Sequence, residues 1–199
     1  MKEELEIVRN WLAQGSINIF GLPFSGKDTH GAELATLLRA EVISGGDILR
    51  NMEGLHDVKN HIAAGNLAPT EAYLATVLPY LSQKRFIGKP LVLSSVGRWH
   101  GEEQSVLKAA EESGHPMKAV IFLSITEQEA EKRWQASERG REDDAEHHIL
   151  LNRFNEFRQK TLPVIDYYRD MGLLVEVDGM PEIEVVTRNI LVKLQDLAT

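Results

Sequence analysis

The sequence predicts an α/β fold in which a five-stranded parallel sheet is covered by helices on both faces. Two observations support this class. Five short, largely apolar segments alternate with stretches of helical periodicity, and each apolar segment is near-continuous, as strands buried on both faces require. The expected strands are 17–20, 40–43, 90–93, 119–123 and 173–177. A chain of 199 residues can bury one sizeable core, so we expect residues 1–199 to form a single domain.

The helices are predicted in order along the chain. Leu5, Val8 and Leu12 recur at helical spacing, which indicates an extra amphipathic helix within residues 1–14, packed on the core or on a second subunit. Later helices are expected at 32–38, 45–51, 71–83, 101–112, 127–137, 145–171 and 182–197. Pro163 is expected to bend the long one. Helical pattern without a strand over about residues 45–75 predicts a small insertion above the carboxyl edge of the sheet.

The composition excludes several classes of function. A net charge of -8 argues against a nucleic-acid polymer as partner, because such a partner requires a broad basic face. The chain has no cysteine, which excludes a disulfide framework, a thiolate nucleophile and a cysteine-based metal site. No apolar run approaches the ~20 residues that span a bilayer, and the acidic N-terminus lacks the hydrophobic centre of a secretion signal. We therefore expect a cytoplasmic protein that acts on neither nucleic acid nor membrane.

The segment Gly21-Leu-Pro-Phe-Ser-Gly-Lys27-Asp-Thr29 is a candidate phosphate-binding loop. It follows an expected strand and opens a helix, so backbone N–H groups and the positive helix end converge where a polyphosphate can bind. Lys27 is expected to reach the outer phosphates. Most such loops place a serine or threonine directly after the lysine for magnesium, whereas here Asp28 intervenes and Thr29 carries the hydroxyl. The segment predicts a P-loop NTPase-type fold that binds ATP through Gly21, Ser25, Gly26, Lys27, Asp28 and Thr29, with Thr29 as a ligand of Mg²⁺.

A hydroxyl displaced by one residue is typical of adenylate kinases, and the loop resembles that of the nucleoside monophosphate kinase family. Phe24 and Asp28 stand where this family usually has glycine. We expect the Asp28 side chain to point to solvent or to cap the helix, and not to act in catalysis. The resemblance covers roughly residues 17–195 and implies that arginines from several elements converge on the loop. Phosphoryl transfer requires alignment and charge neutralisation more than covalent chemistry.

Three segments resemble the family's acceptor site. Residues 46–50 are similar to the segment that brings an arginine, here Arg50, to the acceptor phosphate, and residues 65–69 resemble the turn that holds the acceptor base. Ser94-Ser-Val-Gly-Arg98 is similar to the family's Asp-Gly-Phe-Pro-Arg, with Ser94 in place of the aspartate that orders magnesium-bound water. As an alternative, Arg50 and Arg98 could be ordinary solvated cations. The implied acceptor residues here are Gly45, Asp47, Arg50, Leu67, Ala68, Arg98 and Glu102.

A lid is implied over about residues 134–144. Arg133 stands where the family has its first lid arginine, which implies a role in ATP binding and in catalysis. Arg139-Gly-Arg141-Glu-Asp143-Asp144 resembles the lid's Gly-Arg-x-Asp-Asp, and its short distance from Arg133 implies the short lid, without zinc. Arg153 matches the arginine on the helix that leaves the lid. The implied catalytic set is Lys27, Arg98, Arg133, Arg141 and Arg153, with Arg141 and Arg153 also binding the monophosphate.

Glu102 is the departure that bears on the acceptor base. It stands where adenylate kinases have a glutamine, whose amide both donates and accepts, whereas an ionised carboxylate only accepts. The family's threonine before Gly46 is also absent, because Gly45 occupies its place. We therefore expect AMP as the acceptor, with relaxed selectivity against other monophosphates such as GMP.

Together these features predict a monomeric enzyme that transfers the γ-phosphoryl group of ATP·Mg²⁺ reversibly to a nucleoside monophosphate, giving two ADP from ATP and AMP. Two alternatives stay open. Ser94 and Asp28 also fit a nucleotide-binding P-loop protein with weak or no kinase activity. The loop by itself also fits a P-loop kinase of a small metabolite.

Overall fold

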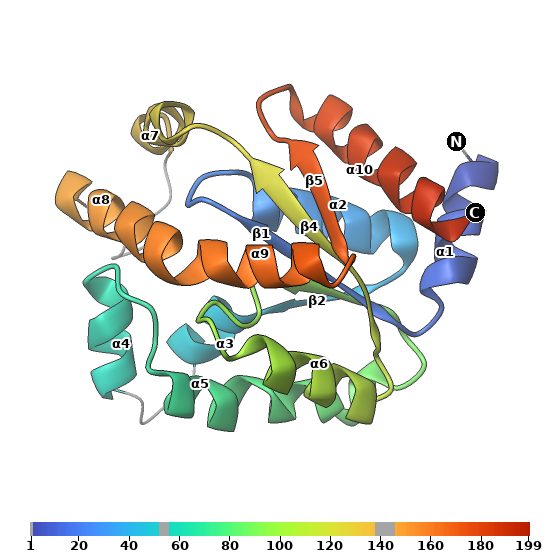
Figure 1. The fold of residues 1–199 in the computed structure, drawn as a ribbon, viewed down its shortest axis with the longest axis horizontal. Coiled ribbons are helices and arrows are strands. Elements are labelled where there is room, and N and C mark those ends of the chain that lie inside the picture. The colour runs from blue at the N-terminus through green and yellow to red at the C-terminus, as the bar shows by residue number, and fades with distance from the viewer. Residues whose placement is uncertain (1, 52–55, 138–145) are drawn as a thin grey trace.

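The computed structural model describes residues 2–51, 56–137 and 146–199, and its five strands form one parallel sheet. The strand order is β2-β3-β1-β4-β5, which confirms the predicted fold class (Figure 1). The strands are β1 Ser16–Gly21, β2 Glu41–Ser44, β3 Leu91–Ser94, β4 Met117–Ser124 and β5 Leu174–Asp178. All five coincide with the predicted segments to within two residues at either end.

Helices cover both faces of the sheet, because alternate residues of each strand point to opposite sides. Ile17 and Ile19 of β1 pack against α1, α2 and α10 on one face, whereas Phe20 packs against α8 and α9 on the other (Figure 1). The α-helices are α1 Lys2–Leu12, α2 Lys27–Leu38, α3 Gly45–Asn51, α4 His56–Ala63, α5 Thr70–Val77, α6 Glu103–Glu112, α7 Glu127–Gln135, α8 His147–Glu156, α9 Leu162–Asp170 and α10 Ile183–Ala198. Within the described ranges, no helix has the length and apolarity needed to cross a bilayer.

Two predicted helices differ from the structure, and a proline is involved in each. The helix expected at 71–83 ends at Val77, because Pro79 follows and the chain continues in two 3-10 turns, Pro79–Ser82 and Lys84–Phe86. The helix expected at 145–171 consists of α8, a π-helical turn at Phe157–Thr161 and α9, with Pro163 in the first turn of α9. The π turn precedes the position where the proline N–H is missing, as is common at helix irregularities.

The extra N-terminal helix packs on the core, the first of the two places expected for it. Val8 and Leu12 of α1 are buried in the same cluster as residues of α2 and α10. Arg9 donates to the carbonyl oxygen of Leu37 at the end of α2 through Nε, at 2.9 Å, and through Nη2, at 2.7 Å. These contacts hold α1 away from the carboxyl edge of the sheet, where β1, β2 and β3 end.

Candidate functional site

The predicted phosphate loop connects the end of β1 to the start of α2. A Cβ atom at Gly21 would lie 2.3 Å from Ser25 Oγ, so the loop closes only if residue 21 is glycine. Gly26, the last residue before α2, has φ +92°, which an L side chain rarely adopts. Lys27 begins the helix and is buried, at 8% exposure. The strand, loop and helix therefore have the arrangement that presents backbone N–H groups to an anion.

Phe24 stands in this loop with φ 64°, a left-handed conformation that is unusual for a bulky residue. Its ring is buried in the same hydrophobic cluster as Phe154 of α8 and Phe157 of the π-helical turn that follows α8. The Arg153 guanidinium lies 5.8 Å from the centroid of the Phe24 ring. The loop is thus packed directly against α8.

Two cavities flank the loop. The first is bordered by residues from segments far apart in the chain, including Lys27, Asp28, Arg50, Leu67, Ala68, Arg98, Glu102 and Arg153. The second is bordered by Phe24, Gly26, Thr29, Arg133 and the β5–α10 connection. The predicted acceptor arginines thus lie on the first cavity, and Thr29 and Arg133 lie on the second.

The segment that carries Arg98 is fixed by hydrogen bonds from three other elements. The Asn18 amide donates to Val96 O at 2.7 Å and accepts from Val96 N at 3.1 Å. The Tyr73 hydroxyl accepts from Gly97 N at 2.8 Å, and the Thr161 hydroxyl donates to Arg98 O at 3.2 Å. These bonds set the place where the Arg98 side chain enters the first cavity.

Positive charge gathers around Arg98. Burial lowers the pKa of its guanidinium, and Arg153 and Arg50 lower it further, while Tyr73 and Asp28 raise it. A guanidinium does not lose its proton in a protein, so the cluster stays cationic. Arg50 and Arg153 both act electrostatically on Arg98, and all three border one cavity, so together they can bind an anion such as a phosphate.

Arg50 and Gly45 are placed by local contacts. Arg50 Nη2 lies 2.6 Å from Asp47 Oδ1, and Asp47 N donates to Ser44 Oγ at 3.2 Å. A Cβ atom at Gly45 would lie 2.8 Å from the Tyr73 hydroxyl, so a threonine at this position would clash with Tyr73. Tyr73 accounts for the glycine found there.

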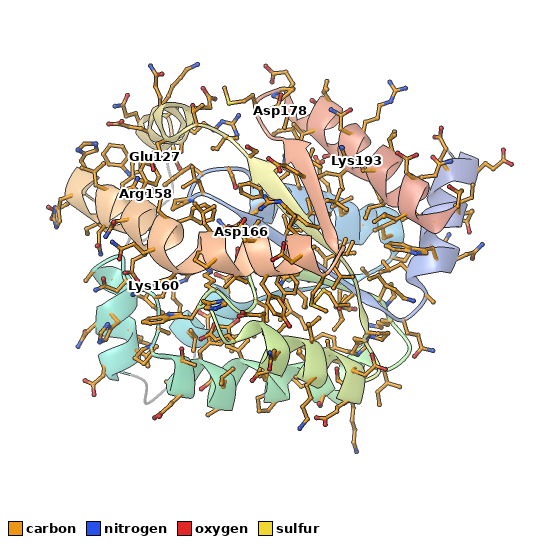
Figure 2. All side chains as sticks on the ribbon, in the orientation of Figure 1. Glu127, Arg158, Lys160, Asp166, Asp178 and Lys193 are labelled. Carbon is orange, nitrogen blue, oxygen red and sulfur yellow. The ribbon has the colours of Figure 1, made fainter. Side chains whose placement is uncertain are left out.

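The turn at residues 65–68 is held against α8 and the π turn. Leu67 N donates to Glu156 Oε2 at 3.0 Å, and Lys160 Nζ donates to the same oxygen at 2.6 Å. Lys160 Nζ also lies 3.9 Å from the centroid of the Trp99 ring, which borders the first cavity. Figure 2 shows Lys160 on the side of the α8–α9 helix facing α4, whereas Arg158 points the other way, toward Glu127 of α7, with which it pairs.

Glu102 is buried, at 1% exposure, beside the Arg98 segment. Its Oε2 accepts from Arg98 N at 2.9 Å and from Trp99 N at 3.1 Å. Its Oε1 makes no hydrogen bond of ordinary geometry to any residue that the structure describes. Burial raises the pKa of the Glu102 carboxyl, although the Trp99 N–H, the Thr70 hydroxyl and the Arg98 N–H lower it. Glu102 therefore borders the first cavity and has one buried carboxylate oxygen, Oε1, that is not used by the backbone N–H groups.

The Arg133 guanidinium lies between the phosphate loop and the β5–α10 connection. Its Nε donates to Glu129 Oε1 at 2.8 Å, and its Nη2 donates to Gly179 O at 2.9 Å. Its Nη1 lies 3.5 Å from Ser25 O in the loop. Arg133 thus connects the two sides of the second cavity.

Comparisons with known proteins agree with this geometry. The family model described as "Adenylate kinase" matches residues 19–173. The chain belongs to the adenylate kinase family. It is 30% identical over 184 residues to the adenylate kinase of Kocuria rhizophila, covering 89% of this chain and 97% of that protein. Two further adenylate kinases are 29% identical: that of a Synechococcus strain, over 85% of this chain and 91% of its own, and that of Xylella fastidiosa, over 88% and 97%. As a member of this family, the chain is a kinase that binds nucleotides.

The Asp28 side chain, expected to point to solvent or to cap α2, is half-buried. Its Oδ1 accepts from Ser94 Oγ at 2.7 Å, and the residue borders the first cavity. The predicted lid residue Arg141 lies outside the described residues, as do Arg139, Asp143 and Asp144. Tyr73, Glu156 and Lys160 were not predicted. Only their contacts with segments distant in sequence reveal them.

Proposed function

We propose that this adenylate kinase family member transfers the γ-phosphoryl group of ATP reversibly to AMP, giving two molecules of ADP. The observation that carries the proposal is the convergence of Arg50, Arg98 and Arg153 on a cavity that also contains Lys27. In a reaction that needs alignment and charge neutralisation, cations that the fold gathers around one cavity lower the barrier.

Each cation has a distinct task in the proposal. Lys27 and the loop N–H groups hold the β and γ phosphates of ATP, and Arg133 holds the donor nucleotide at the second cavity. Arg50 and Arg98 bind the phosphate of AMP. For Arg50 this requires the guanidinium to turn from Asp47 toward the ligand. Arg153, together with Arg141 of the lid, neutralises the charge on the phosphoryl group in transit.

Magnesium fits the oxygen donors around the phosphate loop. Mg²⁺ binds through hydroxyl and carboxylate oxygens together with substrate phosphates and water, and it needs no cage built from protein alone. The Thr29 hydroxyl is the proposed direct ligand, in the first turn of α2. Ser25 Oγ is buried in the loop without a hydrogen-bond partner among the described residues, so it can donate to a phosphate oxygen. When bound, the metal ion neutralises phosphate charge; alignment is the task of the side chains named above.

AMP is proposed as the best acceptor, with incomplete discrimination against GMP. Support for the acceptor pocket comes from Leu67, Ala68, Trp99 and Glu102, which border the first cavity next to Arg98. Ionised Glu102 can accept from the adenine amino group but offers no donor to adenine N1. Guanine presents N1–H and an amino group together, so the same carboxylate suits GMP as well.

The test is a coupled assay of ADP formation with ATP·Mg²⁺ and each of AMP, GMP, CMP, UMP and dTMP. The proposal expects the highest kcat/KM with AMP and measurable turnover of GMP. ATP binding without turnover of any monophosphate would instead indicate a nucleotide-binding protein. ATP turnover that no monophosphate accelerates would indicate a kinase of another metabolite. The Lys27→Ala protein, prepared in parallel, controls for contaminating kinases.

We propose further that the enzyme acts as a monomer in the cytoplasm. Size-exclusion chromatography with light scattering tests the monomer, and fractionation of the source cells tests the location.

A further inference from the structure

The end of β3 carries a hydroxyl where a P-loop enzyme usually needs a carboxylate. P-loop NTPases hold Mg²⁺ between the loop hydroxyl and an aspartate from a neighbouring strand. Strand β3 is the neighbour of β1, and its last residue is Ser94, which is 2% exposed. Strand β4, the other neighbour, ends at Ser124. Neither strand end provides a carboxylate.

A carboxylate nevertheless lies at the end of β3, and it belongs to helix α2. Asp28 follows Lys27 in the first turn of α2, and its Oδ1 accepts from Ser94 Oγ at 2.7 Å. The contact joins two positions 66 residues apart. Asp28 also raises the pKa of Arg98, so its charge acts in the same cavity as the arginine cluster.

This placement is not explained by helix stabilisation alone. A carboxylate in the first turn of a helix interacts favourably with the helix dipole, but that effect needs no partner on a strand. A carboxylate beside Lys27 also repels the phosphates that the loop binds. A cation between the carboxylate and the phosphates would convert this repulsion into attraction on both sides.

We infer that Asp28, oriented by Ser94, supplies the carboxylate that holds the hydrated Mg²⁺ of ATP, and that it does so from α2 instead of from the end of β3. The inference rests on the proposed binding of ATP·Mg²⁺ and adds the residue that recognises the metal. Asp28 and Ser94 are then two compensating differences from the family pattern: the carboxylate is at residue 28 of α2 instead of at residue 94, and residue 94 carries a hydroxyl.

The test measures how strongly Mg²⁺ and ATP favour each other's binding, without any acceptor. ATP is titrated calorimetrically in Mg²⁺ and in EDTA, and the ratio of the two Kd values gives the coupling. Asp28→Asn should reduce this ratio by ~10–100-fold, the usual effect of losing a carboxylate that supports a metal site. In EDTA the same variant should bind ATP equally well or more tightly, because a repulsive charge is gone.

A swap of the two residues distinguishes this role from a structural one. The single variant Asp28→Gly should lose the coupling, and the double variant Asp28→Gly/Ser94→Asp should recover most of it. Asp166→Asn, which removes an exposed carboxylate on α9, should leave the coupling as in the wild type.

Three outcomes would overturn the inference: wild-type coupling in Asp28→Asn, an equal loss of ATP affinity with and without Mg²⁺, or no recovery in the double variant. Because no phosphoryl transfer is measured, the result is separate from that of the acceptor panel. A protein that binds ATP·Mg²⁺ through Asp28 but turns over no monophosphate would refute the proposed function and keep this inference.

Discussion

Replacing Glu102 by glutamine changes one atom at the acceptor cavity. In the native protein Oε2 is held by the N–H groups of Arg98 and Trp99, and Oε1 is the carboxylate oxygen without such a bond, in a residue that borders the cavity. A glutamine carbonyl can keep both backbone bonds, so its amide NH₂ takes the place of Oε1. The group offered to the base then changes from an acceptor to a donor.

The size of the effect follows from one hydrogen bond. Adenine N1 accepts, so it gains a partner in Glu102→Gln, whereas guanine N1–H donates and loses one. A buried donor or acceptor left without a partner costs about 1–3 kcal/mol. At about 1.4 kcal/mol per tenfold change, the ratio of kcat/KM for AMP to that for GMP should rise roughly ten- to a hundredfold.

The assay compares initial rates with AMP and with GMP for the wild type, Glu102→Gln and Glu103→Gln. Glu103 is the matched control, because it is equally buried but accepts from Gly101 N at 2.6 Å and does not border the cavity. An unchanged AMP/GMP ratio in Glu102→Gln would refute the reasoning. The backbone around Leu67 and Ala68 would then set the preference. An equal shift in Glu103→Gln would show that total charge, and not position, is responsible.

Three other predictions follow from the same site. Lys27→Ala should lower kcat by at least about 10²-fold, as loss of a preorganised charge does, with Tm unchanged; near-native kcat would place the phosphates elsewhere. Tyr73→Phe leaves the buried Gly97 N–H without its acceptor, so the free energy of unfolding measured in urea should fall by about 1–3 kcal/mol and KM for AMP should rise. Tyr80→Phe is the control, because the Tyr80 hydroxyl contacts Arg85 at the surface, and it should change neither quantity. Burial raises the pKa of the Glu102 carboxyl, so the folded protein binds this proton more readily than the unfolded chain does, and the contribution of Glu102 to stability rises as pH falls through the raised pKa. The protonated carboxyl is also a donor to adenine N1. The ratio of kcat/KM for AMP to that for GMP should therefore increase as pH falls in the wild type but stay constant in Glu102→Gln.

The fold could be predicted from the sequence because its signals are local. A strand buried on both faces is a short apolar run, and the loop from 21 to 29 shows its own strand, turn and helix within a few residues. The two helices that differed did so at Pro79 and Pro163, where a periodic pattern continues although the backbone cannot. Apolar periodicity does not detect a missing N–H.

The site could be predicted only in part, because several of its contacts join distant positions. The loop and the arginines carry recognisable patterns. Tyr73, in contrast, is important because it packs against Gly45 and accepts from Gly97 N, and Glu156 because it accepts from Leu67 N. The position of Asp28 depends on Ser94, and neither residue predicts it alone. Both residues depart from the family pattern: a carboxylate is gained at residue 28 and one is lost at residue 94. This pair of changes is the signal in the sequence that links the two positions.

The two unusual residues of the phosphate loop have different physical origins. Phe24 holds a left-handed conformation that costs a side-chain-bearing residue about 1–2 kcal/mol, and burial of its ring, worth about 1.5–3 kcal/mol, offsets that strain. The same packing joins the loop to Phe154 and Arg153 of α8. Asp28, in contrast, accepts a hydrogen bond from the Ser94 hydroxyl at the end of β3. The loop is therefore fixed on one side by apolar contact with α8 and on the other by a polar contact with β3. A ligand that shifts α8 would therefore affect the phosphate loop through Phe24, and a change at Ser94 would affect it through Asp28.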